Sequence, residues 1–524
     1  MAQIALAAKH LTSYIIYVIK IFREVAVGLS LTKSEIERIH GALKINGQAF
    51  IDGRFVDATS GKTFDNISPR NGQIIASVAA CDAADVDKAV MAARRAFEAG
   101  VWRDQSPKAR KKVLQRFAAL FEKHMDELAI LETIDMGKPI SESREIDVNV
   151  VLDTLQWYAE CPDKLYDEIA PTGPGQLATI TREPVGVVGA VVPWNFPMLM
   201  ATWKLAPALA TGNSVVLKPA EQSPLTAIRM AELAAEAGIP DGVFNVVPGF
   251  GPTAGKAIGL HMDIDCVAFT GSGDVGKLFL QYAGQSNMKR VYLECGGKSP
   301  NIILDDVPEL RVAAERAATA ICFNQGEVCV APSRLILSER IQDQFLEIVV
   351  ETAKSIRPGD PLDPQTKLGA LVEDGHRTRV ENYIAKGREE GARLVLGGDR
   401  PTTDLGGYYV NPTIFADVKN SMTIAQEEIF GPVLSTITVK DDEEAVRIAN
   451  DTSYGLAAAV WTRDLSRAHK ISRKLRAGTV WVNCYDHGDA TVPFGGFKQS
   501  GNGRDKSLHA LDKYTELKTT WIEL

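Results

Sequence analysis

Hydrophobic and polar residues alternate along the chain in two rhythms, one typical of strands and one typical of helices. Residues 45–70 hold short apolar runs that are broken by Gly53 and by Ser60-Gly61, which predicts a hairpin. The last segment, 514–524, is rich in threonine and predicts an edge strand that pairs elsewhere in the molecule. The globular pattern begins near Ile45 and continues from there.

Two helices are predicted over residues 83–99 and 107–130, where apolar residues recur at helical spacing. Asp82 and Ser106 stand immediately before them, and both residue types are preferred N-caps. We interpret both helices as packing elements, because nothing in them beyond the apolar stripe points to chemistry.

From residue 179 onwards, β-rich runs alternate with helical segments, which is typical of βαβ units and a parallel sheet. The expected strands are Val185–Val192, Ser214–Leu217, Phe244–Val247 and Cys266–Phe269. The expected helices cover residues 223–237, 252–259 and 274–283. A second alternating block runs from residue 300 to 480, so the predicted fold class is α/β.

Composition narrows the class of protein. The chain has 524 residues, room for about two to four domains. Hydrophobic residues make up 45% and charged residues 24%, which excludes disordered and fibrous chains. The net charge of −8 makes nucleic acid an unexpected partner. Seven cysteines, an odd and sparse set, predict free thiols in a reducing compartment, hence a cytoplasmic protein.

The N-terminal extension, residues 1–32, stands apart from this pattern. The stretch Leu11–Leu31 is apolar but contains Lys20, Arg23 and Glu24, and its uncharged part is too short to cross a bilayer. No membrane partner is therefore expected. Three interpretations remain open: an amphipathic helix, a vestigial targeting segment, or an upstream start codon that adds residues without function. The late start of the globular pattern favours the third.

Glycine-rich turns mark a candidate nucleotide site. The run Gly271-Ser-Gly-Asp-Val-Gly276 follows a predicted strand and opens a predicted helix, the context that a dinucleotide-binding turn requires. The pair Gly249-Phe-Gly251 lies between a strand and a helix in the same way. Either turn alone is a weak signal, but two in one α/β block favour a pyrophosphate bound at helix N-termini.

Lys218 and Glu221 follow another predicted strand. A carboxylate at a strand end can accept hydrogen bonds from both ribose hydroxyls and would repel a 2′-phosphate, so NAD is favoured over NADP. The competing interpretation is a surface Lys–Glu pair without function.

Three residues are candidates for the reaction itself. Cys329 ends a run that follows a helix predicted to start near Pro308, and backbone N–H groups at such a loop can favour a reactive thiolate. Glu294 lies among apolar residues and glycines, where its pKa can rise so that it acts as a base. Asn195 follows a predicted strand and could direct its amide at an oxyanion.

The remaining polar residues add little. Four other cysteines, Cys81, Cys161, Cys266 and Cys484, are expected to be buried and inert. No metal site is predicted, because the eight histidines are scattered and no two stand at ligand spacing on one helix.

Together these runs resemble the aldehyde dehydrogenase superfamily from about residue 45 to the end. Seven blocks appear in the family's order: Pro193-Trp-Asn-Phe-Pro197, Lys218-Pro-Ala-Glu221, Phe269-Thr-Gly-Ser-Gly273, Leu293-Glu-Cys-Gly-Gly297, Phe323-Asn-Gln-Gly-Glu-Val-Cys329, Glu428-Ile-Phe-Gly-Pro432 and Pro493-Phe-Gly-Gly-Phe-Lys498. The chain departs from the family pattern at Cys295, where leucine is common, and at Glu327, where glutamine is common.

The resemblance implies a role for each matched residue. Cys329 is the nucleophile, Glu294 activates the water that hydrolyses the thioester, and Asn195 with the backbone N–H of Cys329 holds the oxyanion. The implied cofactor residues, with the two glycine turns, are Trp194, Lys218, Glu221, Gly251, Gly271, Ser272, Glu428 and Phe430. Relatives that pass the acyl group to coenzyme A usually lack this glutamate, so a free acid is the expected product. A semialdehyde or broad-specificity enzyme and a non-catalytic binding member remain alternatives.

The substrate is less clearly marked. Asp486 and Asp489 border the expected substrate entrance, and Gly488 stands where relatives acting on small apolar aldehydes carry an aromatic residue. Other segments resemble a bacterial subgroup that acts on aminoaldehydes and γ-glutamyl-γ-aminobutyraldehyde of polyamine breakdown. The expected apolar tunnel wall is Phe196, Met200, Trp203 and Phe494. The competing interpretation of the two aspartates is solvated loop residues.

The implied architecture has three parts. A Rossmann-type NAD-binding domain covers residues 33–162 and 185–293, and an α/β catalytic domain covers residues 294–499. A small β arm, residues 163–184 and 500–524, is expected to pair with another subunit in a homodimer or homotetramer.

Overall fold

The computed structural model describes residues 31–524, and the interpretations of residues 1–30 lie outside that part of the chain. Its first element is helix α2 (Lys33–Ala42), which contributes the buried Ile36. Thr32 and Glu35 form a capping box, in which Thr32 N donates to Glu35 Oε2 over 2.8 Å. Ordered structure therefore begins before Ile45, and the pattern Thr-x-x-Glu is the sequence signal for it.

Residues 49–294, together with β19 from the last part of the chain, build an eight-stranded sheet. In spatial order its strands are β19 (Gly501–Asn502), β11 (Arg290–Glu294), β10 (Cys266–Thr270), β7 (Val187–Val191), β8 (Ser214–Lys218), β9 (Phe244–Val246), β1 (Ala49–Ile51) and β2 (Arg54–Val56). The five strands from β11 to β9 are parallel, as predicted, and β1 and β2 form the predicted hairpin. A separate hairpin pairs β3 (Thr63–Ile67) with β4 (Ile74–Ala79).

Side chains of one strand alternate between the two faces of this sheet. Val188 and Ala190 of β7 pack with α8 (Pro197–Ala210) and α9 (Leu225–Glu236). Val187 and Val191 pack instead with α3, α10 and α11. Those three helices span Ala83–Glu98, Lys256–Leu260 and Gly273–Gln285. Both faces of the parallel sheet are therefore covered, which explains why its strands are apolar throughout.

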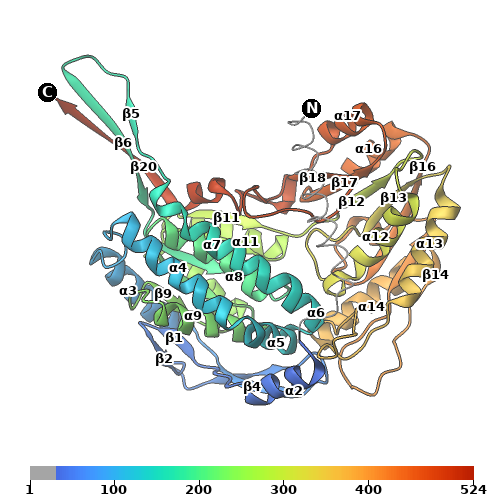
Figure 1. The fold of residues 1–524 in the computed structure, drawn as a ribbon, viewed down its shortest axis with the longest axis horizontal. Helices are drawn as coiled ribbons and strands as arrows, with labels where there is room; N and C mark the ends of the chain where they lie inside the picture. The colour runs from blue at the N-terminus through green and yellow to red at the C-terminus, as the bar shows by residue number, and fades with distance from the viewer. Residues whose placement is uncertain (1–30) are drawn as a thin grey trace, which may run out of the picture.

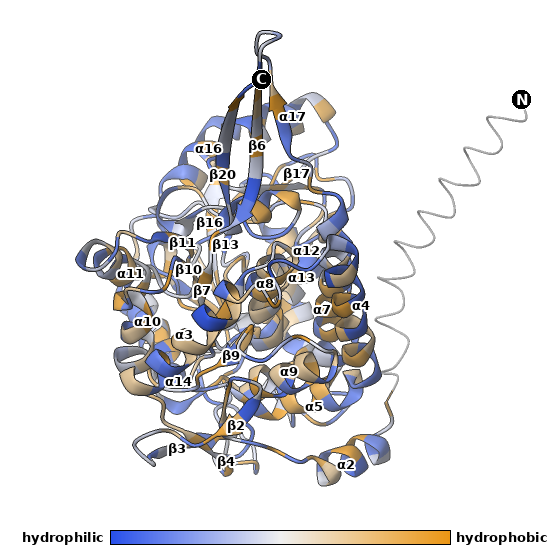
Figure 2. Ribbon diagram, turned by 90° about the vertical axis from the view of Figure 1, so that its left-hand side faces the viewer, coloured by the Kyte–Doolittle hydropathy of each residue, from blue (hydrophilic) through white to orange (hydrophobic). Residues whose placement is uncertain are grey.

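Further helices lie outside α8 and α9 (Figure 2). They are α4 (Pro107–Lys123), α5 (Met125–Met136), α6 (Ile140–Glu142) and α7 (Val148–Ala159), with short helical turns at Ser143–Asp147, Cys161–Asp163 and Gly251–Gly255. Asp82 and Ser106 are N-caps, as predicted. The predicted helix 107–130 is in fact two helices, because the backbone leaves the helical region at His124 (φ −108°, ψ 13°).

The second half of the chain builds a seven-stranded sheet. Its strands are, in spatial order, β14 (Arg393–Leu396), β15 (Thr413–Ala416), β16 (Val433–Val439), β13 (Arg334–Ser338), β12 (Pro300–Ile303), β17 (Ala457–Trp461) and β18 (Thr479–Val482). Only the β14–β15 pair is antiparallel. Its helices are α12 (Leu310–Cys322), α13 (Gln342–Ser355), α14 (Asp374–Glu389), α15 (Thr423–Gln426), α16 (Asp442–Asn450) and α17 (Leu465–Lys474), with short turns at Phe323–Gly326, Lys498–Ser500 and Leu508–Tyr514.

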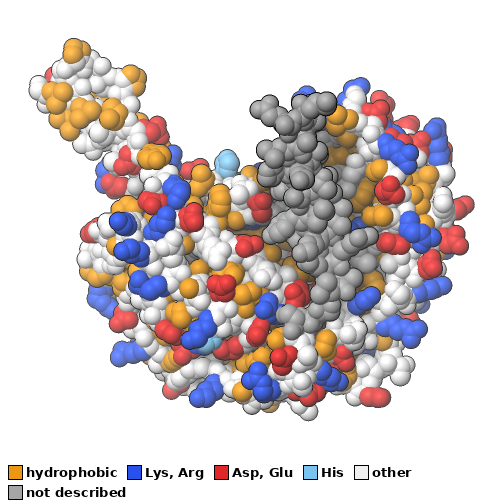
Figure 3. Space-filling view, in the orientation of Figure 1, with side chains coloured by type: hydrophobic (Ala, Val, Ile, Leu, Met, Phe, Trp, Pro, Cys, Tyr) orange, Lys and Arg blue, Asp and Glu red, His pale blue; other side chains and the backbone are white. Residues whose placement is uncertain are grey.

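A three-stranded arm projects from the body, with the C-terminus near its tip (Figure 1). It consists of β5 (Glu168–Ala170), β6 (Gln176–Pro184) and β20 (Thr515–Glu523), all antiparallel. The arm is shorter at its C-terminal side than the predicted 500–524, because β19 pairs with β11 in the large sheet and Tyr514 is fully buried. Hydrophobic side chains gather on its surface (Figure 3), and Trp521 is 59% exposed.

Candidate active site

The candidate residues of the first sheet lie at one edge, because neighbouring parallel strands end there together. β7 leads into Trp194 and Asn195, and β8 into Glu221. β10 leads into Gly271, whose N–H donates to Glu294 O over 3.0 Å, and Glu294 is itself the last residue of β11. Residues far apart in the sequence thus meet at the carboxyl edge of the sheet.

The segment 295–299 carries the chain from this edge into the second sheet. Gly297 N donates to Glu428 Oε1 over 2.9 Å. A Cβ atom on Gly297 would lie 2.5 Å from Cys329 O, and one on Gly296 would lie 1.9 Å from Glu428 Oε2. Only glycine permits so close an approach. This link therefore gathers the candidate base, the candidate nucleophile and Glu428 around one short piece of backbone.

Cys329 follows α12 and a turn in which Asn324 and Gln325 both have positive φ, 45° and 57°. Its side chain is partly exposed. Burial raises the pKa of the Cys329 thiol, and the negative charges of Glu428, Asp486 and Glu294 raise that pKa further. The Val330 N–H opposes this shift but does not outweigh it. Contrary to the prediction that loop N–H groups favour the thiolate, this environment holds a protonated thiol, so a base must remove its proton.

Most of the other cysteines are buried. Cys81, Cys161 and Cys266 are buried, as are Cys295 and Cys322. Cys484, which we expected to be buried, is partly exposed. All seven cysteines lie within the described residues and are free thiols.

Glu294 is a buried carboxyl group, 5% exposed, and neither of its oxygens has a hydrogen-bond partner among residues 31–524. Burial raises its pKa well above the ordinary range. Gly495 makes room for it, since a Cβ atom there would lie 2.6 Å from Glu294 Oε1. A raised pKa makes the carboxylate form of Glu294 a stronger proton acceptor than an ordinary carboxylate, which is the property that a general base needs.

Behind Glu294 lies a buried ionic cluster that the sequence analysis did not find. Asp505 forms ion pairs with Lys204 on one oxygen and with Lys513 on the other, and all three side chains are nearly inaccessible to water. The two lysines lower the pKa of Glu294, whereas Asp505 raises it. No motif marks these residues, because they come from α8, from the segment after β19 and from the last helical turn.

Asn195 is held in place by backbone carbonyls. Its Nδ2 donates to Glu327 O over 2.8 Å, and Asn324 Nδ2 donates to Asn195 O over 3.0 Å. Glu142 fixes this turn in its place by accepting from Asn324 N over 2.9 Å. An amide carries two N–H groups, so the second of Asn195 remains available for an oxyanion.

Glu327, one of the departures from the family pattern, is fully buried. Its Oε1 accepts from Val372 N over 3.0 Å and lies 3.6 Å from Nε2 of His376. His376 in turn contacts Phe430 O over 2.6 Å, and burial lowers its pKa to about 4. The neutral imidazole thus connects the cysteine loop to the loop that carries Phe430.

Several of the residues expected to bind the cofactor are fixed by their neighbours. Lys218 and Glu221 do pair, with Lys218 Nζ donating to Glu221 Oε2 over 3.0 Å, but Lys218 is 3% exposed and so does not lie on the surface. Ser272 is the N-cap of α11. A Cβ atom on Gly276 would lie 3.1 Å from Cys295 Sγ, the close helix–strand approach that the third glycine of such a turn permits. Gly251 begins a helical turn and has open space around it.

Trp194, Phe430 and His376 form an aromatic cluster that connects the first sheet to the second half of the chain. The Trp194 ring lies 5.2 Å from Phe430 and 5.2 Å from His376, measured between centroids and nearly perpendicular in the first case. Phe430 adopts φ 63°, a conformation that only surrounding contacts can maintain in a non-glycine residue. With Glu428 beside Gly297, these residues fit a flat ring and a hydroxyl-bearing ribose.

The expected substrate residues divide into two groups. Trp203 and Phe494 form one wall, with ring centroids 5.0 Å apart. Phe196 is buried instead against Lys138, whose Nζ lies 4.0 Å from the ring centroid, and Met200 is buried nearby on α8. Asp486 and Asp489, on the segment before Phe494, are exposed to solvent. Desolvation by neighbouring protein raises the pKa of Asp486, although its side chain is exposed. We call Asp486, Asp489, Lys506 and the Trp203–Phe494 wall, where the sequence predicts the substrate entrance, the funnel.

Comparison with known proteins shows which family the chain belongs to. The aldehyde dehydrogenase family matches residues 55–520. The chain belongs to the aldehyde dehydrogenase family. It is 52% identical over 483 residues, 92% of this chain and 97% of the other, to the NADP/NAD-dependent aldehyde dehydrogenase PuuC of Escherichia coli strain K12.

Two solved structures are similar over 94% of this aldehyde dehydrogenase and 100% of their own chains. The P. syringae indole-3-acetaldehyde dehydrogenase AldA, solved with NAD+ and IAA, is 60% identical with a TM-score of 0.93. A γ-glutamyl-γ-aminobutyraldehyde dehydrogenase from Burkholderia cenocepacia J2315 is 59% identical with a TM-score of 0.92. The predicted family and the predicted fold are thus confirmed.

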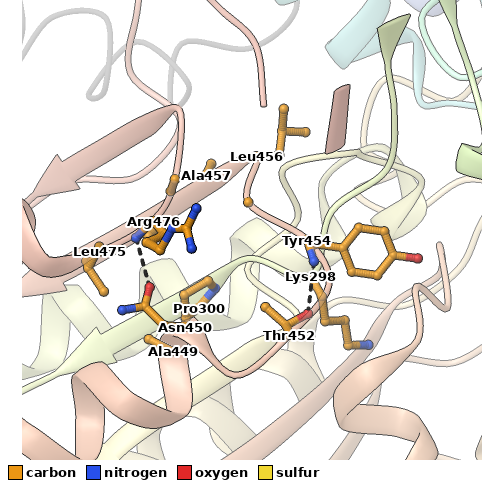
Figure 4. Close-up of a pocket in the computed structure, with 13 residues that line it drawn as sticks. Lys298, Pro300, Ala449, Asn450, Thr452, Tyr454, Leu456, Ala457, Leu475 and Arg476 are labelled. Atoms are coloured by element: carbon orange, nitrogen blue, oxygen red, sulfur yellow. Dashed lines mark hydrogen bonds between the residues drawn. The ribbon is translucent and has the colours of Figure 1, made fainter. Parts of the chain in front are cut away.

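A small pocket of the aldehyde dehydrogenase lies between the segment after Gly297 and the segments 449–458 and 475–477 (Figure 4). It is lined by Lys298, Thr452, Tyr454 and Arg476 among others, and Tyr454 N donates to Thr452 Oγ1 over 3.3 Å. None of the predicted site residues lines it. Within residues 31–524 no group of three or more histidine, cysteine, aspartate or glutamate side chains is placed to hold a metal ion. No helix in that range is long and apolar enough to cross a membrane.

Proposed function

We propose that this aldehyde dehydrogenase oxidises an aldehyde to the carboxylic acid with NAD as electron acceptor, by covalent catalysis at Cys329. The observation that carries the proposal is the convergence of Cys329, Glu294 and Glu428 on the link 295–299. A retired site would have no chemical reason to keep a nucleophile, an unpartnered buried base and an oxyanion amide together.

The first step is attack by the Cys329 sulfur on the aldehyde carbon. Because the surroundings keep this thiol protonated, a buried base takes the proton, and the charge of Glu294 is among those that act on the thiol. The carbonyl oxygen becomes an alkoxide, which the free N–H of Asn195 and the backbone N–H of Cys329 stabilise. One such donor is worth about 10²–10³ in rate.

When bound, NAD would supply the hydride acceptor for the former aldehyde carbon, and the oxidised carbon would remain on Cys329 as a thioester. Lys218 and Glu221 are placed to hold the adenosine end, Gly251, Gly271 and Ser272 the pyrophosphate, and Glu428 the nicotinamide ribose. The carboxylate of Glu221 favours NAD over NADP by repelling a 2′-phosphate. Trp194 and Phe430 provide the apolar surroundings of the ring.

Hydrolysis ends the cycle. Glu294 accepts a proton from water, the resulting hydroxide attacks the thioester carbon, and the Cys329 thiolate leaves with the carboxylic acid as product. The competing function is acyl transfer to coenzyme A, in which the thiol replaces water. An unpartnered Glu294 in a dry site has no evident task in that reaction, so it favours hydrolysis.

For the substrate, we infer an aminoaldehyde or γ-glutamyl-γ-aminobutyraldehyde. The acidic funnel around Asp486 and Asp489 favours a cationic or amide-bearing chain, and the Burkholderia relative is named for the second compound. A second candidate is an aromatic aldehyde, since Trp203 and Phe494 form an apolar wall and the P. syringae relative is named for indole-3-acetaldehyde.

We also propose that the arm of β5, β6 and β20 joins subunits in a homodimer or homotetramer. Its exposed apolar side chains, Ile169, Leu517 and Trp521, need cover that a monomer does not offer. Seven free thiols are in keeping with a reducing, cytoplasmic location.

The test is NADH formation across a panel of aldehydes, with Cys329→Ala beside the wild type. We expect turnover to fall at least about 10³-fold in the variant, because no other group can form the thioester. NAD binding, followed by fluorescence quenching, should persist and shows that the variant is folded. Wild-type activity that appears only with coenzyme A would overturn hydrolysis, and none at all would favour a binding protein.

A further inference from the structure

Three distant segments meet at the outer end of the funnel. Ser507 N donates to Ala490 O over 2.8 Å, which joins the segment after β19 to the loop 486–494. Tyr158 of α7 donates its hydroxyl to Ser507 O over 2.9 Å. Lys506, the preceding residue, is therefore held between α7 and that loop.

The Lys506 ammonium group has an aromatic neighbour but no oxygen acceptor. Its Nζ lies over the Trp203 ring, 5.5 Å from the centroid, in a cation–π contact, and Nζ forms no hydrogen bond or ion pair with any residue of the described range 31–524. Burial lowers the pKa of Lys506, because protein replaces part of its water. The ring face compensates only part of that loss, so an anion from outside would stabilise the ammonium group further.

Carboxylates surround this cation without pairing with it. The charges of Asp489 and Asp486 act on Lys506 and oppose the fall in its pKa. Asp153, on the exposed side of α7, is close enough to Asp489 for their charges to repel. Neither Asp153 nor Asp486 accepts a hydrogen bond from the residues that the structure describes. The funnel thus presents one cation without an oxygen partner and, in Asp153 and Asp486, two carboxylates without a donor. Asp489 Oδ1 accepts from Thr491 N over 2.7 Å, which leaves its Oδ2 for a ligand.

Gly488 keeps the lysine accessible. A Cβ atom at this position would lie 3.5 Å from Lys506 Nζ and 3.9 Å from Val492. A larger side chain would therefore grow directly over the ammonium group and cover it. The absence of a side chain leaves space for a ligand group of a few atoms.

We propose that Lys506 binds a carboxylate at the far end of the substrate, and that Asp153 and Asp489 bind an ammonium group beside that carboxylate. The chemical class is an aldehyde whose opposite end is an α-amino acid. This inference rests on the proposed function and selects one of the substrate classes named there. A simple aminoaldehyde carries only a cation, which Lys506 repels, and an indole aldehyde carries no charge for any of these groups.

The test compares γ-glutamyl-γ-aminobutyraldehyde with the analogue in which hydrogen replaces the α-carboxylate. For each enzyme the measured quantity is the ratio of kcat/KM for the two compounds. We expect Lys506→Met to lower this ratio about tenfold, since a hydrogen bond to a charged group in a partly wet site is lost. Lys354→Met, an exposed lysine on α13, is the matched control and leaves the ratio unchanged.

A second pair of compounds tests the ammonium site. The glutaryl analogue, which lacks the α-amino group, replaces the decarboxylated one, and Asp153→Asn lowers the corresponding ratio several-fold. Together, the two pairs of compounds test whether Lys506 binds the carboxylate of the ligand and whether Asp153 binds its ammonium group.

The outcomes separate the inference from the proposed function. A wild type that oxidises butanal or indole-3-acetaldehyde more efficiently than the γ-glutamyl compound overturns both the substrate proposal and the zwitterion site. A wild type that prefers the γ-glutamyl compound, with the same ratio in Lys506→Met, keeps the substrate and overturns the role of Lys506.

Discussion

Glu294 and Asp486 both act on the Cys329 thiol, but water reaches only one of them. Glu294 is 5% exposed and stands in front of the buried Lys204–Asp505–Lys513 cluster. Asp486 is exposed in the funnel, and the positive charge of Lys506 lowers its pKa. Charge interactions are strong where water is excluded and screened where it is not. The inner carboxyl group is therefore suited to chemistry and the outer one to selecting substrates.

The largest effect tests the inner region directly. In Glu294→Gln, hydrolysis of the thioester should slow by about 10²–10⁴-fold, because no base remains to activate water. The first turnover should persist, so stopped-flow absorbance should show a burst of NADH close to one per active site. A slow first turnover without a burst would show that Glu294 is required earlier, as the base that takes the thiol proton.

Asn195 stands at the border between the two regions. Asn195→Ala should lower kcat by about 10²–10³-fold, since one oxyanion donor is lost. It also removes the hydrogen bond to Glu327 O, which should cost about 1 kcal/mol of unfolding free energy. Denaturant titration measures that cost. A kcat that falls no more than the stability change explains would remove Asn195 from the oxyanion site.

The buried cluster should set the pH dependence of hydrolysis. Lys513 lowers the pKa of Glu294, so Lys513→Met should raise that pKa and keep the base protonated to higher pH. The acidic limb of the kcat–pH profile should move upward by about one pH unit. Asp505→Asn should move it downward, because Asp505 raises the same pKa. Shifts of the same sign in both variants would contradict an electrostatic origin.

The smallest effect belongs to the funnel. Asp489→Asn should raise KM for a cationic aldehyde a few-fold, by about 0.2–1 kcal/mol, and leave kcat unaltered. Raising the salt concentration from 0.05 to 0.5 M should abolish this difference, because Asp489 is exposed. The same change in salt should leave the pH profile of the Lys513 variant in place. If salt does not change the effect of Asp489→Asn on KM, water is excluded from the funnel as completely as from the region around Glu294.

The two regions also differ in how far the sequence predicts them. Lys218 and Glu294 end strands of one parallel sheet, and Asn195 and Gly271 follow two others. A strand pattern with a motif at the end of each strand therefore places these residues together. The Lys204–Asp505–Lys513 cluster and Lys506 come from segments with no shared pattern. Their meeting depends on how the chain returns after β18, which hydrophobic periodicity does not encode.

Local backbone chemistry accounts for the smaller differences. The break at His124 lies within a continuous apolar stripe, so the periodicity predicts one helix where the backbone forms two. Helix α2 lies before Ile45, where the globular pattern begins, and its capping box is the only sequence signal that predicts it. The pKa of Cys329 depends on carboxylates from the end of β11 and from two loops, and no single motif contains all three.

The link 295–299 also limits how this family can be recombined. Glu294 belongs to one sheet and Pro300 begins the other, so the shortest cut between the two halves falls there. Yet Gly297 already bonds Glu428 and lies against the Cys329 carbonyl. A chimera joined at this point would combine Glu294 from one parent with Cys329 from another. The five residues of the link would then match the contacts of neither parent. Exchange of substrate preference between relatives is better placed in the funnel, where loops can change without moving the centre.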